Sequence, residues 1–281
     1  YDTTDPDAYA AAHDMSPGTI GALTLLHEIA HGLGLKHTFE HPVVDRSLES
    51  NTYTLMSYTA PNEGWYGSGS WAISHTPMIL DVPALQFLYG AQTHNEIDTV
   101  YFWTDPDIPF AATIWDSDGV DTLDFSNFTL GHDISLVDGT SSTINFPVSG
   151  TGWDVGQLPD NLSIAPGALI ENVIGGDGND TILGNSLANL IDGGFGNDTM
   201  DGGAGADTFE FYDDFGDDRI LNFDTSSDKL KFLDEDENLI ASGSIASESV
   251  DGNLVLTLGD SSVTLAGLAG TALDDSFLVI A

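Results

Sequence analysis

Three histidines at positions 27, 31 and 37 have the spacing of a metal site. His27 and His31 are four residues apart, so on an α-helix both imidazoles lie on one face and can reach the same ion. Glu28 cannot share that ligand direction, but it can hold and deprotonate a water bound to the ion. Gly34 can adopt a left-handed conformation, which would end the helix and turn the chain so that His37 becomes the third ligand. Three neutral imidazoles with an open fourth position predict a catalytic Zn²⁺ site rather than a structural one.

The full pattern H-E-x-x-H-x-x-G-x-x-H, from His27 to His37, resembles that of the metzincin metalloproteases. The run Leu-Met-Ser-Tyr that ends at Tyr58 is similar to the methionine-containing turn of the serralysin subgroup. This resemblance implies that Met56 forms the floor of the zinc site and that Tyr58 is a further, displaceable zinc ligand. The phenol of Tyr58 could then leave the ion and donate a hydrogen bond to the oxyanion of the tetrahedral intermediate.

Local signals predict the helices that position this site. Ser16 and Pro17 are typical of an N-cap followed by a first helical residue, and helical apolar spacing continues to about Leu33. A second helix is predicted over residues 76–89. Pro83 should kink it or delay its start, because proline has no backbone N–H to donate.

The composition changes near residue 92, where we expect a domain boundary. Gln86 to Ala91 resembles the segment that closes the serralysin protease domain. Residues 1–92 are therefore predicted to be the C-terminal portion of a zinc protease domain, and residues 93–281 a calcium-binding and secretion-signal domain. The expected fold class is the α+β C-terminal half of a metzincin, followed by an all-β parallel β-roll or β-sandwich.

A nine-residue repeat between Gly175 and Glu210 predicts that roll. Its units read GGDGNDTIL, GGFGNDTMD and GGAGADTFE, with a degenerate copy, GNSLANLID, in phase between the first two. The units match the calcium-binding nonapeptide of RTX proteins. Their glycines permit positive φ, and their eighth residues, Ile182, Met200 and Phe209, should fill a narrow core. Successive turns are expected to stack as a right-handed parallel β-roll with Ca²⁺ between them, since Ca²⁺ takes 6–8 oxygen ligands and no single turn provides them.

The candidate calcium ligands form two groups. The roll group consists of the repeat glycines and the sixth-position aspartates: Gly176, Gly178, Asp180, Gly194, Gly196, Asp198, Gly203, Gly205 and Asp207. The upstream group consists of carboxylates spaced closely around one glycine, together with a glutamate: Asp116, Asp118, Gly119, Asp121 and Glu171. Without an ion such carboxylates repel one another, so we expect the C-terminal domain to need calcium in order to fold.

Net charge and cysteine content narrow the partners and the compartment. Lys+Arg number 5 against 45 Asp+Glu, a formal charge of -40, which disfavours nucleic acids and anionic membranes as partners. No apolar run is long enough to span a bilayer. Cysteine is absent, and calcium can replace disulfides as a stabiliser of a secreted protein. The pair Asp274-Asp275 before a short apolar tail resembles the uncleaved C-terminal signal of type I exporters, so an extracellular location is expected.

The serralysin resemblance covers nearly the whole chain but lacks the front of the protease. Only 26 residues precede His27, whereas serralysins carry a longer segment that includes a sheet whose edge strand binds the peptide substrate. The chain could be a fragment, another chain could supply this wall, or the protein could be a shortened relative. We expect a secreted zinc endopeptidase that hydrolyses extracellular proteins, with the missing N-terminal fragment or an inhibitor as further candidate partners. The alternative is a calcium-stabilised scaffold or binding module with a vestigial protease part.

Overall fold

The computed structural model describes two compact units of the chain. The described residues are 14–15, 19–40, 43–59, 73–107, 109–147, 159–212, 214–271, 273 and 275–279. The first unit comprises residues 1–94, 107–115 and 139–168, and the second comprises residues 95–106, 116–138 and 169–281. Among the described residues, no helix combines the length and the apolar character that crossing a bilayer would require.

Helix α2 of the first unit carries His27 and His31, the first two of the three predicted metal ligands. It runs from Ile20 to Gly32, and Thr19 caps it by accepting a hydrogen bond from the backbone N of Ala22 at 3.2 Å. The predicted cap at Ser16 is therefore wrong for this helix, because Thr19 satisfies the free N–H groups of the first turn instead. Ser16 itself lies outside the described residues. Gly34 follows the helix with a φ of 98°, the positive value predicted for it.

Helix α3 begins later than the apolar spacing alone suggests. It runs from Asp81 to Tyr89, so Pro83 lies in its first turn, where the helix needs no hydrogen bond from that position. This is the late start that Pro83 predicts. A short 3₁₀ helix, η1, spans Arg46–Leu48 between α2 and the methionine-containing segment.

A four-stranded sheet completes the first unit and explains why this unit draws on three segments of the chain. Its order is β1-β3-β7-β6, and these strands are Ile73–Ser74, Phe110–Ile114, Leu162–Ile164 and Ser141–Ser142. The predicted boundary near residue 92 assigned residues 107–115 and 139–168 to the C-terminal domain. In the structure they belong to the first unit, because β3 pairs with both β1 and β7.

The second unit is built of two seven-stranded, mostly parallel sheets. One has the order β18-β14-β12-β10-β8-β4-β2 and the other β15-β16-β17-β13-β11-β9-β5. The strands are β2 (Val100–Phe102), β4 (Thr122–Asp124), β5 (Asp133–Ser135), β8 (Asn172–Ile174), β9 (Thr181–Leu183), β10 (Leu190–Asp192), β11 (Thr199–Asp201), β12 (Thr208–Phe211), β13 (Asp217–Leu221), β14 (Lys229–Phe232), β15 (Ala246–Val250), β16 (Asn253–Leu258), β17 (Ser261–Leu265) and β18 (Leu278–Val279). The 3₁₀ helices η2 and η3 span Ser242–Ser244 and Asp275–Phe277.

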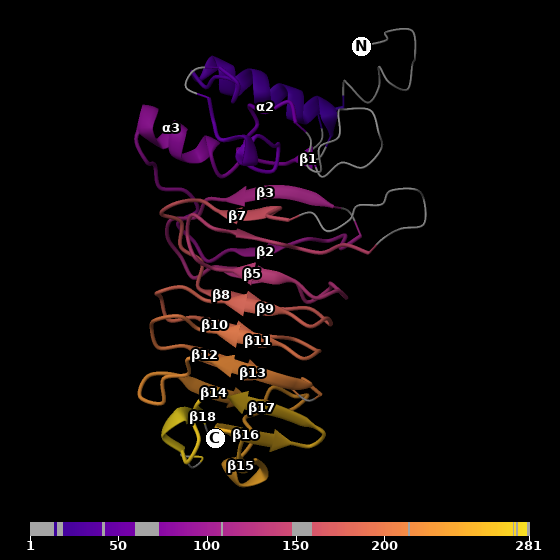
Figure 1. Cartoon of the computed structure of the whole chain (residues 1–281), viewed down its shortest axis with the longest axis vertical. Helices are drawn as coiled ribbons and strands as arrows, with labels where there is room; N and C mark the ends of the chain where they lie inside the picture. The colour runs from indigo at the N-terminus through magenta and orange to yellow at the C-terminus, as the bar shows by residue number, and fades with distance from the viewer. Residues whose placement is uncertain are drawn as a thin grey trace. The chain divides into compact units, whose positions relative to one another are not determined.

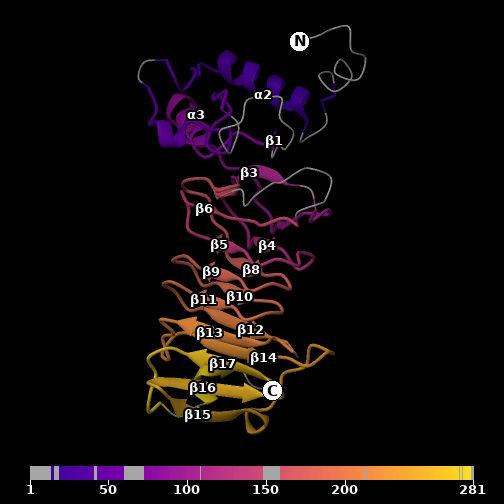
Figure 2. The same cartoon turned by 45° about the vertical axis from the view of Figure 1, so that its right-hand side comes forward.

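From β8 to β14 the chain alternates between the two sheets, and each strand from β8 to β12 pairs in parallel with the strand two later. This winding is a parallel β-roll, and its turns stack one above another in Figures 1 and 2. The predicted core residues Ile182, Met200 and Phe209 are all buried between the sheets, with at most 1% of each residue exposed. The nonapeptide pattern therefore predicted the roll and its core positions correctly.

The last strands of the chain extend both sheets. Strands β16 and β17 are antiparallel to each other and lie inside the second sheet, and β15 forms its edge. β18 adds to the other sheet by pairing in parallel with β14. The predicted acidic pair of the secretion signal is described only at Asp275, since Asp274 lies outside the described residues.

Candidate functional site

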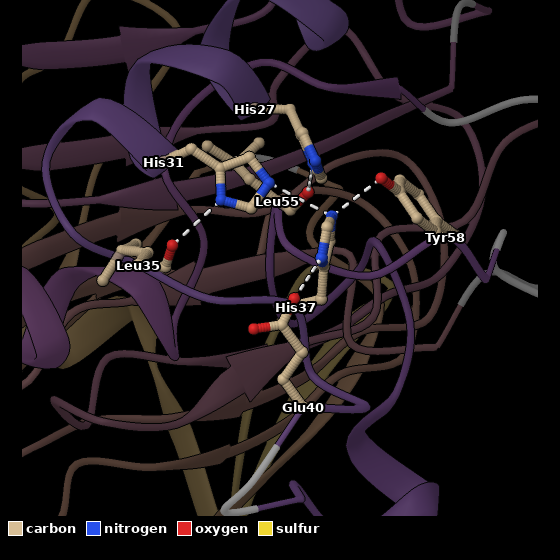
Figure 3. Close-up of polar contacts among 7 residues, drawn as sticks. All are labelled: His27, His31, Leu35, His37, Glu40, Leu55 and Tyr58. Carbon is tan, nitrogen blue, oxygen red and sulfur yellow. Dashed lines mark hydrogen bonds and ion pairs between the residues drawn. The ribbon is translucent and has the colours of Figure 1, made fainter.

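Three imidazoles of the first unit converge on one point, as Figure 3 shows. His27 and His31 come from α2 and His37 from the loop that follows Gly34. One ring nitrogen of each histidine lies within 4.8 Å of the corresponding nitrogen of the other two. The structure thus brings together the three residues that the sequence predicts as metal ligands.

Backbone carbonyls fix the orientation of the two helical histidines. Nδ1 of His27 lies 2.7 Å from the carbonyl oxygen of Leu55, and Nδ1 of His31 lies 3.0 Å from that of Leu35. A carbonyl oxygen only accepts hydrogen bonds, so each Nδ1 must carry the proton. Each Nε2 then presents a lone pair to the shared point, which is the state a metal ligand needs.

His37 is oriented by a carboxylate instead. Its Nδ1 donates to Oε1 of Glu40 at 2.9 Å, and this hydrogen bond is the main reason that the pKa of Glu40 lies below its usual value. Its Nε2 lies 3.1 Å from Nε2 of His31 and 2.7 Å from the hydroxyl oxygen of Tyr58. Two imidazole lone pairs at 3.1 Å repel each other unless a cation or a shared proton lies between them.

The residues at this point fit Zn²⁺. Nε2 of His27 is buried and has no hydrogen-bond partner among the described residues, a state that costs free energy unless the nitrogen binds a ligand. Three neutral imidazoles and a phenol are nitrogen and oxygen ligands of the kind that Zn²⁺ accepts in catalytic sites. A cation at the shared point would relieve the lone-pair repulsion and satisfy the buried nitrogen together.

The structure also describes the other three residues that the sequence predicts for this site. Glu28 is exposed on α2, next to His27. Met56 is buried, and it packs in an apolar cluster with Leu23 and Ala30 of α2. Tyr58 is 49% exposed, so its hydroxyl can contact His37 and still face the solvent.

Several residues of the site were not predicted from the sequence. The carbonyls of Leu35 and Leu55 carry no sequence signal, because every residue has a carbonyl. Glu40 had one, since an acidic residue three positions after a ligand histidine can reach its outer nitrogen. Asp81 is 2% exposed and accepts hydrogen bonds from Thr54 and Leu55, far from it in sequence.

In the second unit, three of the five upstream calcium candidates meet. Asp116 and Asp121 are fully buried, and one carboxylate oxygen of each has no hydrogen-bond partner among the described residues. Glu171 accepts a hydrogen bond from the backbone N of Asp121 at 2.9 Å. Burial, with the nearby carboxylates of Asp116 and Glu171, raises the pKa of Asp121 to about 6. Asp118 is exposed, and Gly119 has a φ of 115°.

The repeat aspartates form ladders along the roll. Asp198 accepts a hydrogen bond from the backbone N of Asp180, and Asp218 accepts one from Asp198, both at 2.8 Å. Asp207 and Asp228 make the same contacts on the other sheet, where Asn189 takes the place of an aspartate. Asp218 and Asp228 were not predicted, because they follow the last repeat: Asp218 keeps one repeat glycine, Gly216 with a φ of 98°, but not the leading pair, and Asp228 keeps none.

Burial raises the free energy of ionising the carboxyl groups in these ladders. It is the main cause that raises the pKa of Asp198 to about 8 and that of Asp218 to about 7, and neighbouring carboxylates add to the shift. Burial also raises the pKa values of Asp180 and Asp207 to about 6. A bound cation would remove this cost.

The repeat glycines serve two different purposes. Gly194, Gly196, Gly203 and Gly205 have the predicted positive φ, between 84° and 137°. Gly176 and Gly178 do not, so the expectation of a left-handed turn fails in the first unit of the repeat. There a side chain is excluded by close packing instead: a Cβ would collide with the carbonyl of Phe128 at Gly176 and with the backbone N of Gly131 at Gly178.

Comparison with known proteins gives one consistent family. Residues 84–241, more than half of the chain, match the family described as Peptidase M10 serralysin C terminal. Over 193 residues the chain is 37% identical to Serralysin G of Dickeya chrysanthemi, and this match covers 61% of this chain and 38% of that protein. It is also 37% identical over 203 residues to a serralysin of Photorhabdus laumondii, covering 64% of this chain and 40% of that protein. The match thus spans about two fifths of the length of these relatives.

Among solved structures, the chain is similar to the extracellular lipase LipA from Serratia marcescens. The sequence identity is 18%, the match covers 74% of this chain and 42% of that chain, and the TM-score is 0.34. At this score the likeness carries no argument about function.

Proposed function

Because the chain belongs to the serralysin C-terminal family of M10 peptidases, we propose that it is the zinc-binding and C-terminal part of a secreted metalloendopeptidase. The observation that carries the proposal is the convergence of three Nε2 atoms, one of them buried without a partner among the described residues, on a point that fits Zn²⁺. In this proposal His27, His31 and His37 hold the ion, and the first unit is the C-terminal half of a metzincin protease domain.

The residues around the ion have distinct roles in peptide hydrolysis. When bound, Zn²⁺ would polarise the scissile carbonyl and lower the pKa of water. Glu28, exposed beside His27, would take the proton from the attacking water and pass it to the leaving amine. Tyr58 would turn its hydroxyl from His37 to the oxyanion and donate a hydrogen bond there.

Calcium would complete the second unit. Burial raises the pKa of Asp121 to about 6 and that of Asp198 to about 8, so a bound cation would favour the ionised form of both carboxylates. A roll that calcium stabilises can stay unfolded in a calcium-poor cytoplasm and fold after export. This is consistent with an extracellular protease that leaves the cell through a type I exporter.

The test is hydrolysis of casein by the protein produced from its complete reading frame. We expect activity that a zinc chelator abolishes and added Zn²⁺ restores. Glu28→Gln should keep its zinc and lose at least about a hundredfold in kcat, since the general base is gone but the ligands remain. Retained hydrolysis by Glu28→Gln, or a loss of zinc from this variant, would contradict the role assigned to Glu28.

A second candidate is a calcium-stabilised scaffold with a vestigial protease part. It is favoured by the position of the family match, which begins at residue 84 and therefore excludes the zinc ligands. A protein that binds calcium and zinc but leaves casein intact in the assay above would support the scaffold.

A further inference from the structure

A continuous chain of hydrogen bonds runs from the zinc-site histidine His27 into the interior of the first unit. Nδ1 of His27 donates to the carbonyl oxygen of Leu55 at 2.7 Å. The same peptide group carries the N–H of Met56, which donates to Oγ1 of Thr54 at 3.0 Å. The hydroxyl of Thr54 in turn donates to Oδ1 of Asp81 at 2.6 Å. The chain thus joins an imidazole to a carboxylate through one peptide group and one hydroxyl.

Every link of this chain points in the same direction. The imidazole, the peptide group and the hydroxyl each donate toward Asp81, and a peptide transmits polarisation between its C=O and N–H because its bonds are conjugated. Hydrogen bonds that are aligned in series strengthen one another. The side chain of Thr54 must accept a hydrogen bond from Met56 and donate one to Asp81 at the same time, and among side chains of this size only a hydroxyl does so.

The carboxylate at the end of the chain is held in place by two further contacts. Oδ2 of Asp81 accepts hydrogen bonds from the backbone N atoms of Leu55 and Met78, at 2.7 and 2.9 Å. Thr54 and Asp81 are both buried, 3% and 2% exposed, so water does not compete for these contacts. Asp81 also lies in the first turn of α3, where the helix dipole favours a negative charge.

We propose that Thr54 and Asp81 are positioning residues for the zinc ligand His27, acting through the Leu55–Met56 peptide group. The inference rests on the zinc site of the proposed function. Neither residue touches the ion. Their effect is to keep the proton of His27 on Nδ1, to direct its Nε2 lone pair at the ion, and to make that lone pair a stronger donor. The segment with Met56 therefore links His27 to Asp81 by hydrogen bonds, in addition to packing against α2 through the Met56 side chain.

The test is the zinc affinity of the 281-residue chain, measured by competition with a chromophoric chelator. Thr54→Val keeps the shape of the side chain but removes the hydroxyl, and it should weaken zinc binding by about tenfold or more. Thr54→Ser restores a hydroxyl and should bind zinc within about twofold of wild type. Thr113→Val is the matched control, because Thr113 is also buried in the first unit and its Oγ1 has no hydrogen-bond partner among the described residues. It should leave the affinity unchanged.

Asp81→Asn provides a second, independent variant. The amide oxygen can still accept from Leu55 and Met78, but the amide nitrogen then faces Thr54 and reverses the direction of the last link. We expect a weakening of about tenfold in zinc affinity. Circular dichroism of the zinc-free variants separates this effect from loss of folding.

The tautomer of His27, read from ¹⁵N chemical shifts of the zinc-free protein, gives a readout that does not need the metal. Wild type should show the Nδ1–H form, and Thr54→Val a mixture of the two tautomers. Wild-type zinc affinity in folded Thr54→Val or in folded Asp81→Asn, or an unchanged tautomer in Thr54→Val, would overturn the proposal. A wild-type protein that binds zinc but does not hydrolyse casein would instead count against the proposed protease function alone.

Discussion

At the scale of single residues, Tyr58 is the side chain whose position suggests movement. Its hydroxyl is 2.7 Å from Nε2 of His37, yet about half of the residue is exposed. A phenol that serves mainly in the transition state should affect turnover more than binding. We predict that Tyr58→Phe lowers kcat by about a hundredfold with KM changed by less than about threefold. Steady-state kinetics on a peptide substrate decide this, and an unchanged kcat would remove Tyr58 from the mechanism.

A second prediction at this scale concerns Glu40, the carboxylate that orients His37. Glu40→Ala removes the acceptor of the Nδ1 proton, so it should weaken zinc binding by about tenfold. Glu49→Ala, a change at another acidic residue of the same unit, is the charge-matched control and should have no such effect. Equal zinc affinities of the two variants would show that the hydrogen bond to Glu40 does not support the ligand.

The ligand spacing predicted which histidines meet, because helix geometry and one glycine turn fix their positions locally. It could not predict what holds them. Asp81 and Thr54 are 27 residues apart, and their contact depends on how α3 packs against the segment with Met56. Of the residues that orient the imidazoles, only Glu40 left a local signal.

At the scale of elements, the turns of the roll depend on glycines that two separate effects require. Gly194 has a φ of 84°, and a Cβ there would collide with the carbonyl oxygen of Gly176 in the preceding turn. We predict that Gly194→Ala destabilises the calcium-loaded protein by about 2–4 kcal/mol, the sum of backbone strain and overpacking. Urea unfolding in saturating calcium measures this.

Two controls separate those effects. Gly252 has a φ of 89°, but no atom lies within 4 Å of the place that a Cβ would occupy, so Gly252→Ala should cost only the backbone strain, about 1 kcal/mol. Gly243 has neither feature, and Gly243→Ala should stay within about 0.5 kcal/mol of wild type. Equal destabilisation by all three variants would contradict the role assigned to the stacked turns.

The nonapeptide pattern predicted the roll strands because each repeat supplies one strand, two repeats complete one turn, and each turn contacts mainly its neighbours. The sequence was less informative where pairing is not local. The first unit's sheet joins β1 to β3 and β7, which lie far apart in the chain, and no periodic signal connects them. The same reason hid the inclusion of β16 and β17 in a sheet that is otherwise mostly parallel.

At the scale of the whole molecule, the formal charge of -40 means that carboxylates dominate the roll. Bound protons and bound Ca²⁺ can each neutralise the buried ones and so stabilise the folded state. Asp198 and Asp218 have folded-state pKa values of about 8 and about 7, well above the ordinary value of 3.8. Without calcium the folded state therefore binds more protons than the unfolded state above about pH 4. The stability that these two groups contribute is fully present below about pH 4 and is lost as the pH rises toward about 8.

We predict that the calcium-free protein has a higher Tm at about pH 5 than at about pH 8. Saturating calcium should raise the Tm most at the higher pH, because the ion replaces protons that are absent there. Each tenfold rise in free Ca²⁺ above Kd should add about 1.4 kcal/mol per linked site. Thermal unfolding followed by circular dichroism tests this, and a calcium-free Tm that is equal or higher at the higher pH would contradict the assigned pKa shifts.

The central claim is that His27, His31 and His37 hold one Zn²⁺, and the zinc content of the purified chain tests it most directly. We predict one tightly bound zinc per chain in wild type and in His94→Ala, a histidine outside the cluster. His31→Ala should lose more than about a hundredfold in affinity, since it removes a ligand. Zinc uptake that His31→Ala leaves unchanged, or a wild-type chain that takes up none, would contradict the account.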